Sequence, residues 1–329
     1  MGDLFPSAGY IPVVQTAYFM EKYFSEEKYM QLEASGVIDR GTLDDTAKKG
    51  DFVNTPKLVQ AAPFTRSDVT STDTTGGTRI SSNAGKLPVL RDVSINKISE
   101  HDDIRTGENF EVMLASSAGN QMAKRTVKQL DRSLKGALGA ITTHTRTTYP
   151  SALTVQAVRQ CKAQLGDQGQ NLHTMLVHSK VWFDLVRDLI ENYKYMGVTS
   201  GKIIEEGKLD TIMGIRNIII SDDLIPDAGT GSSTLSPAYN TYLLGEKCIY
   251  QEFQRLLNVQ TWSDVRVQST LHYVKFSMDY VLGPTAVKFS GSANPADDDF
   301  ANSSNWAIST EDLRNANYAS IVTVGGKFS

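Results

Sequence analysis

Residues 107–143, GENFEVMLASSAGNQMAKRTVKQLDRSLKGALGAITT, are the most informative stretch of the sequence. Apolar residues recur along it at steps of three and four, the spacing that places side chains on one face of an α-helix. At about 1.5 Å per residue such a helix would be about 50 Å long. The stretch therefore predicts a long helix that serves as a spine. Its apolar stripe consists of Val112, Ala123, Val127, Leu130, Leu134, Leu138 and Ile141.

The two halves of this helix differ in pattern. The first half carries a second apolar face, and charged residues lie opposite the stripe in the second half. We therefore expect the first half to be covered on two sides and the second half on one. The second face consists of Phe110, Leu114, Ala118 and Met122, and the charged side of Lys124, Arg125, Lys128, Asp131, Arg132 and Lys135.

The residues before the spine divide into two parts. Residues 1–40 predict an arm followed by a helix over 16–35, which ends at Gly36 and whose aromatic residues must pack on something. Residues 41–98 are rich in turn residues, and 41–80 contain nine Thr. Their apolar residues are too sparse for a core, and a structureless loop of this length is rare inside a compact domain. We expect this segment to lie against another molecule.

Beyond Pro150 the pattern becomes α/β, with short buried strands between helices. After Leu256 the alternation of apolar residues changes phase between Tyr273 and Val274, which predicts a bulge or a change of face. The chain from 291 onward is polar, and we expect the acidic run 297–299 to be a solvated tail. The expected elements are helices over 154–165 and 180–193 and strands over 174–177, 215–220, 242–244, 285–289 and 320–324.

Composition excludes several classes of protein. The 329 residues are 40% hydrophobic, enough for a core, and no run of about 18 apolar residues predicts a membrane span. The start has no signal-peptide pattern, so we expect synthesis and folding in a cytosol. Lys and Arg number 33 against 37 Asp and Glu, which disfavours a protein that grips nucleic acid. Cys161 and Cys248 are far apart and predict no disulfide or zinc site.

Catalytic motifs are missing from the sequence. It contains neither a GxSxG elbow nor an HExxH metal pair, and residues 197–203 have the wrong spacing for a phosphate loop. His173 and His178 are close in sequence, but we expect a structural role for His178 at a strand–helix junction. Asp222-Asp223 could pair on a metal, although a solvated turn after a strand is the more ordinary interpretation. We expect no catalytic residue, cofactor or metal.

Taken together, these features resemble the major capsid proteins of tailed bacteriophages, which have the Hong Kong 97-type shell fold. The resemblance covers nearly the whole chain and depends on the order of short phrases. Each phrase alone is weak. The phrases are residues 35–38 with 50–56, 103–107 with the helix up to 134–138, 175–181, 218–223, 241–245 and 283–287.

The resemblance implies an α+β, Hong Kong 97-like capsid fold with an N-terminal arm, extended β loop, long spine helix, peripheral domain and α/β axial domain. The chain lacks the long coiled N-terminal extension of some relatives, and the Lys, Asn and acid that cross-link others cannot be matched. The implied parts are 1–40, arm and helix; 41–98, extended loop; 99–149, spine helix of the peripheral domain; 150–256, axial domain; and 257–329, peripheral strands and C-terminal tail.

The resemblance also implies partners. Copies of the chain would form hexamers and pentamers of an icosahedral virion capsid, assembled in the host cytoplasm around double-stranded DNA that is held without sequence-specific binding. A separate scaffolding protein and a portal are expected, decoration proteins are possible partners, and no membrane is involved. Two alternatives remain: the shell of a non-viral encapsulating compartment with the same fold, and an α/β enzyme with an unrecognised site.

Basic residues of the extended segment are the candidate contacts between subunits. They would meet acidic surface on a neighbour and set register more than strength, because one rim charge contributes about 0–1 kcal/mol. The candidates are Lys57, Arg66, Arg79, Lys86 and Arg91.

Overall fold

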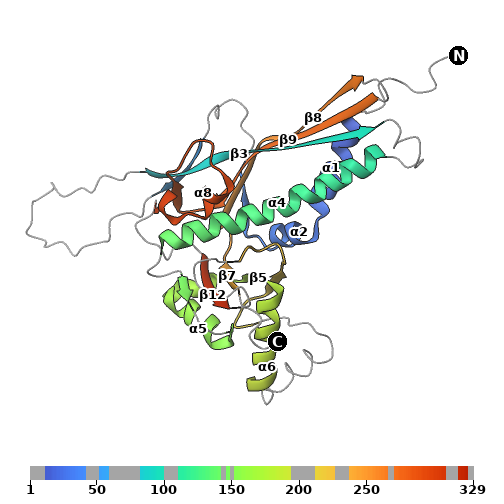
Figure 1. Cartoon of the computed structure of the whole chain (residues 1–329). Coiled ribbons are helices and arrows are strands. Elements are labelled where there is room, and N and C mark those ends of the chain that lie inside the picture. Colours follow the sequence, from blue (N-terminus) through green and yellow to red (C-terminus); the bar gives the residue numbers. More distant parts are fainter. Residues whose placement is uncertain are drawn as a thin grey trace, which may run out of the picture.

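Two β-sheets enclose one long helix in the computed structural model (Figure 1). The structure describes residues 12–41, 52–58, 82–99, 110–141, 146–148, 152–193, 212–226, 237–265, 270–308 and 318–324. The seven-stranded sheet has the order β1 (Ile38–Arg40), β8 (Ile249–Val265), β9 (Thr270–Pro284), β3 (Ser82–Ser99), β10 (Val287–Phe289) and β11 (Trp306–Ile308), and β2 (Phe52–Leu58) pairs with β3. The five-stranded sheet has the order β4 (Arg146–Thr148), β12 (Tyr318–Val324), β7 (Ala238–Leu244), β5 (Thr174–Val177) and β6 (Asn217–Ile220).

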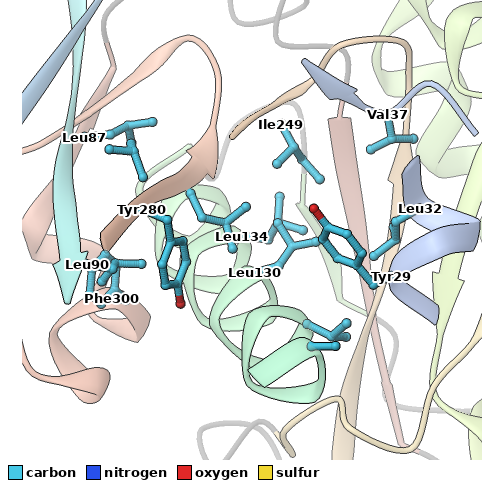
Figure 2. Close-up of a cluster of buried hydrophobic side chains, with 14 of the residues drawn as sticks. Tyr29, Leu32, Val37, Leu87, Leu90, Leu130, Leu134, Ile249, Tyr280 and Phe300 are labelled. Carbon is cyan, nitrogen blue, oxygen red and sulfur yellow. The ribbon is translucent and has the colours of Figure 1, made fainter. Parts of the chain in front are cut away.

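The predicted spine is helix α4, Phe110–Ala140, with 31 residues. Its stripe packs as expected, and Leu130 and Leu134 lie between Tyr280 on one side and Tyr29 on the other (Figure 2). The prediction that the first half of this helix is covered on two sides and the second half on only one was wrong. The second half is the more enclosed one and buries even Thr126, Gln129, Asp131 and Ser133, whereas in the first half Met113 is exposed. The second half of α4 is the more enclosed one because it is the part that lies between the two sheets (Figure 1).

The predicted first helix is two helices, α1 (Pro12–Ser25) and α2 (Glu27–Ala34). Glu26 separates them and caps α2, because its side chain accepts hydrogen bonds from the backbone N–H groups of Lys28 and Tyr29. Phe19 and Tyr23 are buried as expected and Phe24 is half-buried, whereas Tyr18 is exposed. Phe19 stacks on Phe276 of β9 at 5.5 Å. Gly36 ends the region with φ of 73°, a conformation that favours glycine.

The bulge predicted between Tyr273 and Val274 is absent from the described pairing. Strand β9 pairs with β3 without a break from Leu271 to Val281, and the irregularity lies in β8 between Phe253 and Asn258. The apolar series in the sequence combined two strands, since Val265 ends β8 and Leu271 already belongs to β9.

The segment from 291 to 308 is packed, so the expectation of a solvated acidic tail was wrong. Helix α8 (Asp297–Ala301) and the 3₁₀ turn Ser303–Asn305 carry Phe300 and Trp306 onto Phe289, with ring centroids 5.1 and 5.2 Å from that ring. Asp297 forms ion pairs with Arg125 and Arg132 of α4 at 3.1 and 2.8 Å. Asp297 thus holds α8 on the spine.

The five-stranded sheet carries helices α5 (Val155–Gln164) and α6 (Ser179–Tyr193) and the 3₁₀ turn Gly166–Asn171. The strands expected over 174–177, 215–220, 242–244 and 320–324 are present as β5, β6, β7 and β12, with β7 longer than expected. Strand β12 lies between β4 and β7, so a segment near the end of the chain completes this sheet.

Candidate assembly surface

The distal part of the seven-stranded sheet exposes several apolar side chains among polar ones on one face. Partners in an antiparallel ladder point to the same side of the sheet. Val93 of β3 lies opposite Ser277, Ile95 opposite Lys275, and Lys97 opposite Tyr273, which in turn lies opposite Trp262 of β8. We call the side chains on this side the outer face: Arg91, Val93, Ile95 and Lys97 of β3, Tyr273, Lys275, Ser277 and Asp279 of β9, and Asn258, Gln260 and Trp262 of β8.

Several of these apolar side chains are open to solvent. Val93 is 54% exposed, Ile95 59% and Trp262 44%, and the ring of Trp262 stacks on that of Tyr273 at 5.2 Å. Large apolar side chains that are exposed together on a well-ordered sheet are typical of protein–protein contacts. Sequence reasoning missed this face, although Val93 and Ile95 at a spacing of two are its signal.

The opposite side of the same strands faces the helices. There Asp92 accepts a hydrogen bond from the hydroxyl of Tyr280 at 2.8 Å and pairs with Arg125 of α4 at 2.9 Å. Arg125 also pairs with Asp297, so one guanidinium joins β3, α4 and α8. A groove of about 420 Å³ lies beside this contact, with Phe19, Phe276 and Met278 in its lining. The charged contact fixes the angle between sheet and spine.

The basic residues proposed as contacts between subunits have different surroundings in the structure. Lys57 lies on β2 opposite Asn83 in the strand register, and Lys86 lies on β3 opposite Asn54. Lys86 is half-buried with its ammonium 3.7 Å from the centre of the Phe52 ring, a cation–π contact within the chain. Arg91 is exposed on the outer face, opposite Asp279. Arg66 and Arg79 lie outside the described residues.

The residues weighed for chemistry have structural partners. His178 is buried, its ring stacks on Tyr239 at 3.9 Å, and burial lowers its pKa. The two acids that follow β6 diverge, because Asp223 pairs with Lys128 at 3.3 Å and Asp222 accepts a hydrogen bond from Ser179. The described residues contain no group of His, Cys, Asp and Glu that could hold a metal ion, and none of the described helices is long and apolar enough to cross a membrane. Cys161 and Cys248 are free and buried.

Comparison with protein families identifies the chain. A family model described as "Major capsid protein 13-like" matches residues 33–316, most of the sequence. The chain belongs to this family of major capsid proteins. It is therefore a structural component of a virion capsid and not an enzyme, and the alternative of an α/β enzyme is excluded.

Solved structures show the same mixed α+β fold as this capsid protein. The Cyanophage Pam1 capsid matches with a TM-score of 0.60 at 12% identity, covering 90% of this chain and 92% of that one. The capsid of Ralstonia phage GP4 matches with 0.58 at 11% identity, covering 88% and 87%. The SrpI encapsulin of Synechococcus elongatus PCC 7942 matches with 0.52 at 11%, covering 90% and 88%. No curated protein matches the sequence.

These matches bear on the remaining alternative, the shell of a non-viral encapsulating compartment. Phage capsids and an encapsulin share the fold at similar identities, so the fold by itself does not separate a virion from a compartment. The family model does, because it describes major capsid proteins. A capsid consists of many copies, and this capsid protein associates with itself.

Proposed function

We propose that this capsid protein forms hexamers and pentamers that close into an icosahedral shell around double-stranded DNA. The observation that carries the proposal is the outer face, where the apolar side chains of Val93, Ile95 and Trp262 are exposed together. Standard interfaces bury roughly 1,600 Å², and many modest contacts around each subunit add up through multivalency. The outer face would be buried when a second copy lies against it.

We further propose the division into structural parts that the resemblance implies. Residues 1–40 form the arm, 41–98 the extended loop, 99–149 the spine helix region and 150–256 the axial domain, with the peripheral strands and tail over 257–329. The pairing of β2 with β3 supports an extended loop, and the position of α4 between two sheets supports a spine. Strand β12 would belong with the axial sheet, since it pairs with β7.

The five basic residues keep their proposed role as contacts that set register between subunits. Arg91 is the best supported, because it is exposed on the outer face beside Val93. Lys86 is the least supported, because it already contacts Phe52. A separate scaffolding protein, a portal and decoration proteins are proposed partners. The net charge of −4 would let DNA move past the inner wall.

The test is a double variant, Val93→Asp with Ile95→Asp, in the full-length chain. Both side chains are exposed, so we expect a folded subunit with the thermal unfolding temperature of the wild type. Electron microscopy should then show closed particles for the wild type and none for the variant. Lys124→Asp, an exposed change on α4, serves as the matched control and should assemble. Normal shells from the double variant would contradict the proposed role of the outer face.

A further inference from the structure

One buried carboxylate joins helix α4 to the five-stranded sheet. Asp131 lies in the enclosed half of α4 and is 1% exposed. Its Oδ1 accepts a hydrogen bond from the hydroxyl of Tyr242 at 2.6 Å, and its Oδ2 accepts one from the backbone N–H of Ile225 at 2.8 Å. Tyr242 belongs to β7, and Ile225 follows β6. A single side chain of the helix therefore holds two separate segments of the five-stranded part of the fold.

The hydroxyl of Tyr242 has two acceptors for its one proton. Besides Oδ1 of Asp131, the main-chain carbonyl oxygen of the same residue lies 3.1 Å away. An ionised Asp131 accepts only, so the hydroxyl donates to Oδ1. A protonated Asp131 can instead donate from Oδ1 to the Tyr242 oxygen, while the hydroxyl turns to the main-chain carbonyl. Both protonation states of Asp131 thus have hydrogen-bond partners without movement of the backbone.

The charges around Asp131 come from several elements. Arg132 and Lys135 of α4 attract the ionised form, and Lys128 is paired with Asp223 at 3.3 Å in the segment after β6. The neighbouring Asp222 bonds to Ser179, and β7 contains no charged residue. Burial nevertheless dominates and raises the pKa of Asp131 to about 6, with the donors Tyr242 and Ile225 acting in the opposite direction.

We propose that Asp131 and Tyr242 form a proton-operated switch that sets how firmly the five-stranded sheet is held to helix α4. In the ionised state the closed arrangement buries a charge, and the cost of desolvating it outweighs the charge-assisted bonds from the Tyr242 hydroxyl and the Ile225 N–H. Proton uptake removes this buried charge, turns the Tyr242 hydroxyl to the main-chain carbonyl and leaves Ile225 bonded. The segment after β6 then opens less often from the helix.

Hydrogen exchange of the full-length chain tests this switch. Exchange of the segment 221–226 is followed by mass spectrometry at about pH 5 and about pH 7.5, and each rate is divided by that of an unprotected amide at the same pH. We expect the protection of this segment to rise by about fivefold at the lower pH. The segment 287–308 of the other sheet serves as the internal reference and should not change.

Two variants separate the switch from a general effect of acid. In Asp131→Asn, the neutral amide keeps the shape and an acceptor for Ile225, so the protection of 221–226 should not depend on pH. In Tyr242→Phe, the loss of a donor to the carboxylate should move the change in protection to higher pH. Equal protection at both pH values in the wild type would overturn the proposal. An unchanged pH response in either variant would overturn it as well.

Discussion

At the scale of single residues, the spine helix carries side chains whose surroundings differ sharply along its length. Leu134 is fully buried between the two sides of the core (Figure 2), whereas Lys124 is exposed on the same helix. Asp131 is also buried, but it is matched by Tyr242 and Ile225. The position of a residue on the helix, and not its polarity alone, therefore determines how much a substitution lowers the free energy of unfolding.

Leu134→Asp tests the stripe. It places an unpaired charge in the core and removes apolar contacts, and we expect a loss of at least about 4 kcal/mol in the free energy of unfolding. Lys124→Asp should change this free energy by no more than about 0.5 kcal/mol. Urea unfolding of both variants measures the difference, and equal effects would contradict the packing of the stripe.

Asp131 makes stability depend on pH. Its pKa is raised from 3.8 to about 6 in the folded chain, so its neutral form favours folding and this contribution is lost as the pH rises through about 6. A shift of this size corresponds to about 3 kcal/mol. The free energy of unfolding of the wild type, minus that of Asp131→Asn, should fall by about this amount from about pH 4 to about pH 7.5. A difference that stays constant with pH would contradict the burial of an ionisable carboxyl.

At the scale of elements, the position of α8 on α4 depends on a glycine. A side chain at Gly136 would meet the carbonyl oxygen of Phe300 and the indole nitrogen of Trp306, which are hydrogen-bonded to each other at 2.8 Å. Helix α8 can approach the spine closely only because this position has no Cβ. The ion pairs of Asp297 with Arg125 and Arg132 fasten the same contact from the exposed side.

Gly136→Ala should therefore destabilise the chain by about 1–3 kcal/mol, because the added methyl group separates α8 from α4. Ser117→Ala, at an exposed position of the same helix, should be neutral or slightly stabilising, since Ala is the better helix former. Thermal unfolding compares the two variants. A stabilising Gly136→Ala would show that α8 is not seated as described.

The local sequence pattern was sufficient to predict the helices and strands, but it was not sufficient to predict how they pack against each other. The period of α4 and the apolar runs of β5 and β6 identified helix and strands, because they depend on neighbours in sequence. The burial of the second half of α4 depends on residues more than a hundred positions away, such as Tyr242 against Asp131. The packing of Phe300 and Trp306 depends on Phe289 and on Gly136 of the helix. The outer face was missed for the same reason, since exposure of Val93 is a property of the assembled sheet.

At the scale of the whole molecule, the extended segment and the outer face serve contacts between copies in our proposal. Removing residues 60–85 tests the segment. We expect a soluble subunit, because the core described around α4 lies outside this range, and no closed particles. Size-exclusion chromatography followed by microscopy measures both properties. A deletion variant that builds normal shells would contradict the assignment of this segment.

Electron microscopy of the purified full-length chain over a range of concentrations, alone and mixed with the proposed scaffolding protein, tests the central claim most directly. The account predicts closed shells whose capsomers are rings of six and five copies. A chain that stays monomeric at every concentration in that mixture would contradict it.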